Sequence, residues 1–139
     1  MLDLHYWPTP NGKKVTIQLE ECGVPYNIVQ CNIGKGDQFD SSFLDICPNN
    51  RMPALVDHEP KDGGEPISVF ESGAILMYLA DKYNKFYEAK DRNVINQWLM
   101  AQMGTIGPML GQHHQFHHYN PGKSEFGEER YFKIAKRLY

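Results

Sequence analysis

The chain has 139 residues, of which 41% are hydrophobic and 22% charged, and its formal net charge is −3. These values are typical of a packed globular protein and exclude a disordered, collagen-like or coiled-coil chain. The near-neutral charge argues against a nucleic-acid partner. The longest apolar run, 73–80, is far shorter than the roughly 20 residues that a membrane-spanning helix needs, so no membrane partner is expected.

The cysteine content favours a reducing compartment. Cys22, Cys31 and Cys47 are three in number, so they cannot all pair within one chain, and no CxxC pair occurs. The N-terminus has neither a basic segment nor a long apolar one, so a secretory signal is not predicted. We therefore expect a cytoplasmic protein.

Strands and helices alternate in the first part of the chain. Residues 2–7 alternate apolar and polar side chains, which predicts a strand that ends at the turn 8–12. Val15, Leu19 and Cys22 recur at helical spacing, which predicts a helix over 13–22 capped by Asn11 or Gly12. Further strands are expected over 26–33, 53–57 and 67–70, with helices over 41–47, capped by a serine, and 72–83.

This order predicts an α/β fold. A strand, a helix and a strand in succession form a right-handed parallel crossover. The loop between 57 and 67 is too short for a crossover, so the last two strands are expected to pair as a hairpin. The sequence therefore predicts a mixed four-stranded sheet with helices packed on it.

After residue 83 the pattern becomes entirely helical. A polar connector, 84–90, precedes a long helix that begins near Asp91 and is expected to kink at Pro108. A loop at 119–122 separates it from a last helix that Ser124 opens. That helix carries Tyr131, Ile134, Ala135 and Leu138 on one face. Two such helices cannot close a bundle, so we expect 91–139 to be an incomplete part of a larger helical domain.

Five segments carry a family resemblance. They are PTPNG (8–12), GKGDQF (34–39), NNRMPAL (49–55), FESGAIL (70–76) and WLMAQMGTIGPMLGQ (98–112). Together with the element order they resemble the glutathione transferase superfamily, and most of all its nu-class and fungal prion-regulator-like branch. That branch includes glutathione-dependent disulfide reductases. The resemblance implies a thioredoxin-like glutathione-binding domain over 1–83, a linker over 84–90, and the first helices of an all-α domain over 91–139.

Glutathione carries two carboxylates, an ammonium and a thiol, and the FESGAIL segment suits its γ-glutamyl end. Ser72 stands at a predicted helix N-cap, where the hydroxyl, the backbone N–H and the helix dipole form a carboxylate site. Glu71 beside it can pair with the ammonium group. The alternative is that Ser72 is only a capping residue, which would leave Glu71 unexplained.

Other glutathione contacts are implied by the resemblance. It implies a cis bond at Met52-Pro53, with the Met52 backbone pairing with the cysteinyl unit as an added strand; otherwise Pro53 merely begins a strand. Gln38 is expected to contact the glycyl end, and Arg51 either the other carboxylate or solvent. Arg130 is assigned to a glutathione carboxylate, or it pairs with an acidic neighbour on its own helix.

The thiol needs an activating group, because a free thiol has a pKa of roughly 8.5 and is mostly protonated at neutral pH. Hydrogen-bond donors at a helix N-terminus stabilise the thiolate. The resemblance assigns this role to Thr9 and Asn11, which flank the turn 8–12; the alternative is a plain turn with an Asn cap. Tyr6 is expected in the core, and Cys22 and Cys31 are expected to be small apolar fillers rather than nucleophiles.

The second half contains a histidine cluster. His113 with His117, and His114 with His118, are i,i+4 pairs, a spacing at which two imidazoles can bind a metal. No Asp or Glu stands at the matching positions, so no metal is predicted; lining of a substrate cleft is preferred, and placement on the surface is the alternative.

The leading hypothesis is an enzyme that reduces small disulfides through the thiolate of bound glutathione, with weaker conjugation of electrophiles. The resemblance also implies a homodimer. A non-catalytic glutathione-binding module that serves regulation or dimerisation is the main alternative, because fold alone does not decide function. A glutathione peroxidase would use the same site.

Overall fold

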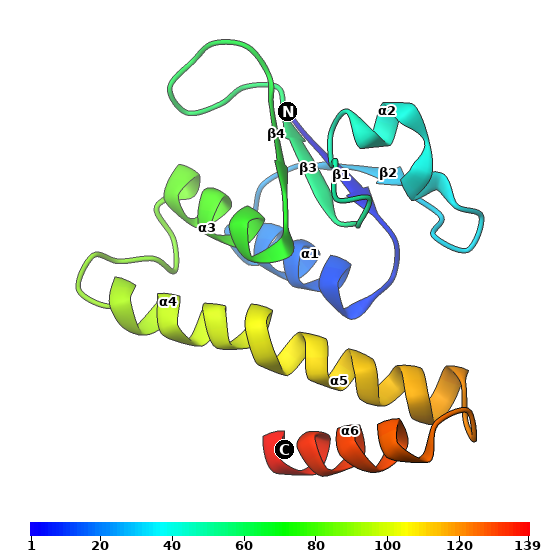
Figure 1. The fold of residues 1–139 in the computed structure, drawn as a ribbon. Coiled ribbons are helices and arrows are strands. Elements are labelled where there is room, and N and C mark those ends of the chain that lie inside the picture. Colours follow the sequence, from blue (N-terminus) through cyan, green and yellow to red (C-terminus); the bar gives the residue numbers. More distant parts are fainter. The chain divides into compact units, whose positions relative to one another are not determined.

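The computed structural model describes residues 1–139, which divide into two compact units, Met1–Ala89 and Lys90–Tyr139. The first unit combines four strands with three α-helices and one 3-10 turn (Figure 1). In chain order these are β1 (Leu2–Tyr6), α1 (Pro10–Cys22), β2 (Asn27–Gln30), η1 (Asp37–Phe39), α2 (Ser41–Leu44), β3 (Ala54–Asp57), β4 (Ile67–Phe70) and α3 (Ser72–Tyr83).

The four strands form one mixed sheet in the order β2-β1-β3-β4. β1 runs parallel to β2 and antiparallel to β3, and β3 pairs with β4 as an antiparallel hairpin. The predicted mixed sheet is therefore confirmed, including the parallel crossover through α1 and the closing hairpin.

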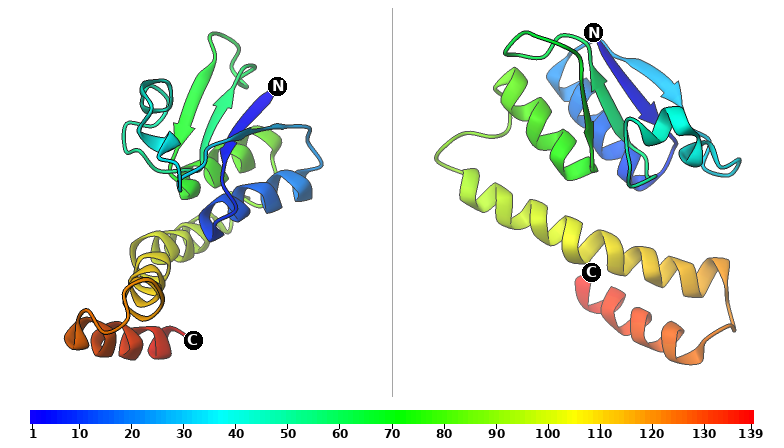
Figure 2. Two further views of the ribbon diagram at one scale, coloured as in Figure 1. Left: turned by 90° about the vertical axis from the view of Figure 1, so that its right-hand side faces the viewer. Right: turned by 45° about the horizontal axis from the view of Figure 1, so that its top comes forward.

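Two apolar clusters form the core of this unit, one on each face of the sheet. α1 and α3 lie side by side and cover one face, while α2 lies on the other (Figures 1 and 2). Successive strand residues point to opposite faces, so Leu55 belongs to the first cluster and its neighbour Ala54 to the second. The first contains Leu2, Leu4, Val15, Leu19, Leu55, Ile75 and Leu79, and the second Cys31, Phe43, Cys47, Met52 and Ala54.

The bounds of β4 and α3 agree with the prediction, whereas the segments predicted for β2 (26–33) and α2 (41–47) were longer than the observed elements. β2 ends at Gln30 because Asn32 starts a tight turn: its backbone N–H donates to Asp37 Oδ2 at 2.7 Å, and its own Oδ1 accepts from Gly34 N–H at 3.0 Å. α2 ends at Leu44 rather than at 47. Asp40, not a serine, occupies its N-cap position.

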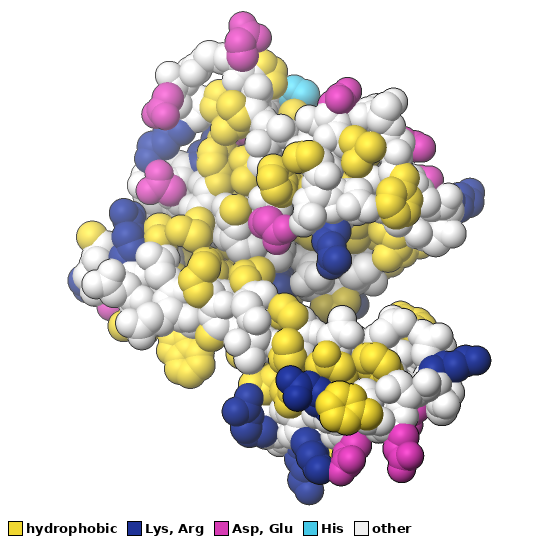
Figure 3. Space-filling view, viewed as in Figure 1, with side chains coloured by type: hydrophobic (Ala, Val, Ile, Leu, Met, Phe, Trp, Pro, Cys, Tyr) yellow, Lys and Arg dark blue, Asp and Glu magenta, His cyan; other side chains and the backbone are white.

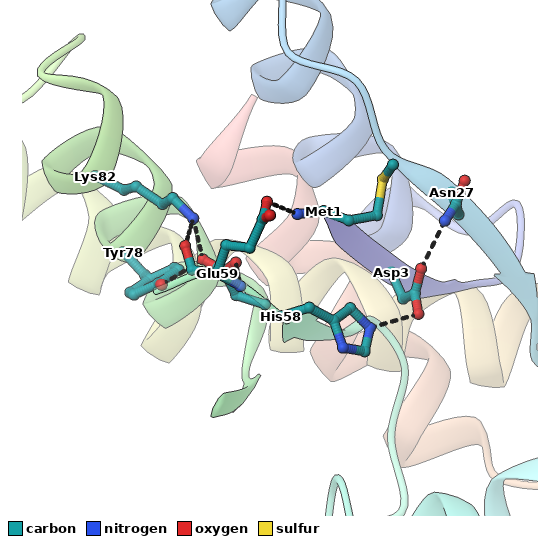
Figure 4. A network of polar contacts seen from close by, with 8 residues as sticks. Met1, Asp3, Asn27, His58, Glu59, Tyr78 and Lys82 are labelled. Carbon is teal, nitrogen blue, oxygen red and sulfur yellow. Dashed lines mark hydrogen bonds and ion pairs between the residues drawn. The ribbon is translucent and has the colours of Figure 1, made fainter. Parts of the chain in front are cut away.

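A buried carboxylate ties α3 to the sheet (Figure 4). Asp57, at the end of β3, is fully buried. Its carboxylate accepts a hydrogen bond from Tyr78 Oη at 2.6 Å and forms an ion pair with Lys82; Tyr78 and Lys82 both lie on α3. The Glu59 backbone N–H donates to the same carboxylate at 2.9 Å, and the Glu59 side chain pairs with the N-terminal ammonium of Met1. These contacts fix the distal part of α3 and so help to hold the whole helix in place.

The second unit is a long helical segment followed by α6 (Glu125–Leu138). The segment contains α4 (Arg92–Ala101), the π-turn η2 (Gln102–Ile106), α5 (Gly107–His114) and the π-turn η3 (Gln115–Tyr119). The disturbance expected at Pro108 takes the form of a π-turn just before it, in which Gly107 N–H donates to Gln102 O. Such a wider i→i+5 turn is a recognised cause of helix bending, and it lies directly before the proline.

α5 and α6 pack against each other. The Ser124 hydroxyl accepts from Gly127 N–H at 3.1 Å, which confirms Ser124 as the cap of α6. Phe116 and Tyr131 stack with ring centroids 5.4 Å apart. Hydrophobic side chains nevertheless reach the surface of the second unit's helices, as Figure 3 shows; the exposed ones include Val94 and Trp98 on α4 and Phe126 on α6. None of the helices has the length and apolar character needed to cross a membrane.

Candidate functional site

The N-terminus of α1 is capped by Thr9. Its backbone is extended (φ −107°, ψ 162°), and its Oγ1 accepts a hydrogen bond from Gly12 N–H at 3.3 Å. Pro10 occupies the first helical position, where its missing N–H costs nothing. The prediction that Asn11 or Gly12 caps this helix was therefore wrong: both lie inside its first turn.

Gly12 allows β1 and α1 to approach closely. A Cβ atom at this position would lie 2.6 Å from the Trp7 carbonyl oxygen and 2.8 Å from the Tyr6 ring. Only glycine fits there without movement of the backbone. Tyr6 packs against the core cluster, as predicted, and its ring lines this turn.

The segment before β3 meets the Thr9 turn. The Met52-Pro53 peptide bond is cis, as the resemblance implied, and both residues are buried. Thr9 Oγ1 donates to Met52 Sδ at 3.6 Å across 43 residues of sequence. The structure therefore brings together two of the segments that carry the resemblance, PTPNG and NNRMPAL.

The third segment is the N-terminus of α3. Ser72 is the first helical residue and only 6% exposed, while Glu71 holds the N-cap position, so the assignment of Ser72 as the cap was wrong by one residue. Glu71 has a φ of 70°, uncommon for a residue other than glycine and typical of functional sites. Its Oε1 accepts from Asn49 Nδ2 at 3.0 Å. Glu71 is thus held by a residue of the NNRMPAL segment.

Two residues that the sequence analysis did not assign take part in this group. One is Asn49, through its bond to Glu71. The other is Lys14, whose Nζ donates to Asn11 Oδ1 at 2.9 Å. Asn49 was visible only as part of a motif, because its partner stands 22 residues away. Lys14 could have been found from its i,i+3 spacing to Asn11.

Gln38 and Arg51 make contacts within their own segments of the chain. Gln38 lies on η1, where its Nε2 donates to Ile33 O at 3.5 Å and its Oε1 is buried with no hydrogen-bond partner. A buried polar atom without a partner is costly and marks a place where a ligand atom could bind. The Arg51 side chain is exposed, and its carbonyl oxygen accepts from Cys47 Sγ at 3.2 Å. The glutathione contacts of both residues stay predictions.

Arg130 belongs to the second unit, where it lies exposed on α6, and its assignment also stays a prediction. The histidine pairs are in the same unit. The ring centroids of His113 and His117 are 4.2 Å apart, and those of His114 and His118 are 4.6 Å apart. No group of three or more His, Cys, Asp or Glu side chains that could hold a metal ion occurs in the structure.

The three cysteines are unpaired and buried, as small core residues would be. Cys22 is 8% exposed, Cys31 2% and Cys47 1%. Burial raises the pKa of the Cys31 thiol, with the nearby Asp37 carboxylate acting in the same direction. None of these thiols therefore has the solvent exposure of a reactive cysteine.

Three polar segments thus converge in the first unit: a capped helix N-terminus with a hydroxyl and an amide, a cis-proline loop, and a second helix N-terminus with an acid. Residues 2–81 match the family described as "Glutathione S-transferase, N-terminal domain". The chain belongs to the glutathione S-transferase family. The predicted thioredoxin-like character of the first part of the chain is thereby confirmed, as is the resemblance to this superfamily.

Relatives support the same branch. The chain is 51% identical to the disulfide-bond oxidoreductase YfcG of Escherichia coli (strain K12), over 100% of the chain and 66% of that protein. It is 36% identical to the transcriptional regulator URE2 of Saccharomyces cerevisiae (strain ATCC 204508 / S288c), over 94% of the chain and 38% of that protein. A solved glutathione transferase from Burkholderia graminis, with two glutathione molecules bound per subunit, has a TM-score of 0.93 and 43% identity. The match covers 99% of the present chain and 58% of the Burkholderia chain. The chain therefore spans about two thirds or less of the length of these relatives.

Proposed function

We propose that this protein binds glutathione where the N-termini of α1 and α3 and the loop before β3 converge, and that it reduces small disulfides with the bound thiolate. The observation that carries the proposal is the contact between Thr9 and Met52, together with that between Asn49 and Glu71. These two contacts join three segments that together offer partners for each polar group of glutathione.

The γ-glutamyl end of glutathione fits the N-terminus of α3. The first backbone N–H groups of a helix have no partner within the helix, and the helix dipole favours a carboxylate there. Ser72 adds a hydroxyl at this point, and Glu71 offers a carboxylate for the ammonium. An added strand along Met52 would hold the cysteinyl unit, and Gln38 Oε1 could accept from an N–H of the glycyl end.

The thiol would then lie near the N-terminus of α1. There the Asn11 amide can donate to the sulfur, and the Thr9 hydroxyl can do so by turning from Met52 Sδ to the bound thiolate, a stronger acceptor; both hydrogen bonds lower the thiol pKa. The thiolate attacks one sulfur of the disulfide RSSR, forming a glutathione mixed disulfide and releasing RS⁻. A second glutathione thiolate attacks the mixed disulfide, yielding glutathione disulfide and another RS⁻. Two glutathiones thus supply the two electrons, and no cysteine of the enzyme is needed, which agrees with the burial of all three.

The test is glutathione-dependent reduction of a small model disulfide by the full-length protein, followed with a coupled reductase that consumes glutathione disulfide. Thr9→Ala should lose most of the activity, whereas Thr9→Ser, which keeps the hydroxyl, should retain it. Thr16→Ala is the matched control, because that hydroxyl donates within α1 to Lys13 O at 3.1 Å. Equal activity of Thr9→Ala and Thr16→Ala would contradict the proposal.

A non-catalytic glutathione-binding module is the second candidate, favoured by the similarity to a protein named as a transcriptional regulator. Binding of glutathione without turnover of disulfides, peroxides or electrophiles would support it. Turnover with an electrophile or a peroxide but not with a disulfide would indicate a conjugating enzyme or a peroxidase.

We also propose a homodimer located in the cytoplasm. The exposed hydrophobic side chains of the helical unit, among them Trp98 and Met100, support the dimer, and the unpaired cysteines support a reducing compartment. Sedimentation equilibrium of the full-length protein tests the dimer, since a monomer at micromolar concentration would contradict it.

A further inference from the structure

One contact at the α1 N-terminus fixes the direction of an amide. Lys14 Nζ donates to Asn11 Oδ1 at 2.9 Å. An ammonium group has only donors, so it must face the amide oxygen, and the amide NH₂ of Asn11 must then point the other way. The orientation of an Asn side chain is ordinarily ambiguous, but here the chemistry of the partner decides it.

The surroundings of Lys14 distinguish it from an ordinary surface lysine. Its side chain is half-buried, whereas that of Lys13 beside it is exposed. Burial lowers the pKa of Lys14, and the charge of the Glu71 carboxylate acts in the opposite direction. Lys14 therefore bonds directly to Asn11 and also feels the charge of Glu71.

We propose that Lys14 is a positioning residue for the thiolate: it holds the Asn11 amide so that its NH₂ group donates to the glutathione sulfur. This inference rests on the proposed function. Without Lys14, the amide can turn over and present its oxygen to the sulfur, which would repel a thiolate. The ammonium also polarises the amide, because hydrogen bonds in a chain strengthen one another.

The expected effect appears in the thiol pKa. A hydrogen bond to a charged group stabilises the charged form, and part of that stabilisation is lost when the donor is no longer oriented. We expect Lys14→Met to raise the pKa of enzyme-bound glutathione by about one unit. Lys14→Arg, which keeps a cationic donor, should restore most of the shift.

The experiment is a pH titration of the thiolate's ultraviolet absorbance in complexes of the full-length protein with glutathione. The variants are Lys14→Met, Lys14→Arg, Asn11→Ala and the double variant Asn11→Ala with Lys14→Met. Lys13→Met is the matched control, because it removes the same charge from the adjacent exposed position. We expect this control to titrate as the wild type does.

The outcomes separate the two proposals. A wild-type complex whose thiol titrates as free glutathione does would overturn the proposed function itself. If the wild type shows a lowered pKa and Asn11→Ala raises it, but Lys14→Met does not, only the role of Lys14 is overturned. The role of Lys14 is also overturned if Lys14→Met shifts the pKa as much in the Asn11→Ala background as in the wild type. The lysine would then not act through the amide.

Discussion

Asp57→Asn is expected to destabilise the first unit strongly. Asp57 is 0% exposed and accepts from Tyr78, Lys82 and the Glu59 backbone N–H (Figure 4). Removal of one partner of a buried ion pair costs about 3–5 kcal/mol, because the other charge stays buried. The Lys82 side chain is only 13% exposed, but it can still donate to Glu59 O at 2.6 Å. We therefore expect a cost at the lower end of this range, a decrease of about 3 kcal/mol in the free energy of unfolding.

The effect should depend on pH. Burial by itself raises the pKa of Asp57, but the hydrogen bonds from Lys82, Tyr78 and the Glu59 N–H together outweigh it, and the pKa is lowered. A carboxyl with a folded-state pKa below its unfolded value of about 3.9 stabilises the fold above that pH. This stabilisation is lost as the pH falls through the folded-state pKa. The difference between wild type and Asp57→Asn should thus be largest near neutral pH and shrink below about pH 4.

Urea unfolding followed by circular dichroism, at neutral and acidic pH, measures this difference. Glu59→Gln is the matched control, because its carboxylate belongs to the same network but is 80% exposed in its pair with the N-terminus. Exposed ion pairs contribute little, so no measurable change is expected. An Asp57→Asn protein as stable as Glu59→Gln, or a difference that stays constant into acid, would show that the Asp57 carboxylate does not stabilise the fold in this way.

Three further outcomes follow from the packing and from the site. Gly12→Ala should destabilise the protein by about 2–3 kcal/mol in urea unfolding, because the Trp7 carbonyl 2.6 Å from the new Cβ is backbone and cannot easily move. Gly127→Ala should cost less, about 1–2 kcal/mol, because the atom 2.7 Å away belongs to the Phe116 ring, which can shift; an equal loss would contradict this distinction. Ser72→Ala should weaken glutathione binding about tenfold in calorimetry, with little change in kcat; unchanged affinity would remove Ser72 from the γ-glutamyl site.

Much of the fold could be predicted because local signals agreed with it. The helix over 72–83 and the strand over 67–70 have their predicted bounds, since apolar periodicity and flanking polar residues mark both. The start of α1 was misplaced because Thr9, Asn11 and Gly12 are all acceptable caps. Only the backbone conformation decides among them, and Thr9 is the extended one.

The candidate site was predictable in its segments but not in its contacts. The motifs containing Thr9, Met52 and Glu71 were recognised in the sequence. The bond from Asn49 to Glu71 joins residues 22 positions apart, and that from Thr9 to Met52 residues 43 apart. Such contacts depend on the strand order, which places β3 between β1 and β4 and so brings the three segments to neighbouring positions. The π-turn before Pro108 is likewise defined by a backbone hydrogen bond, from Gly107 N–H to Gln102 O, and no side-chain pattern in the sequence marks it.

In the proposed mechanism Asn11 acts on the glutathione sulfur while the α3 N-terminus binds the other end of the molecule. The most direct measurement is kcat and the glutathione KM for disulfide reduction by wild type and Asn11→Ala. A lost hydrogen bond to a thiolate predicts a fall in kcat of about 10- to 100-fold with little change in KM. A rise in KM that accounts for the whole loss of activity, or no loss at all, would contradict this role of Asn11.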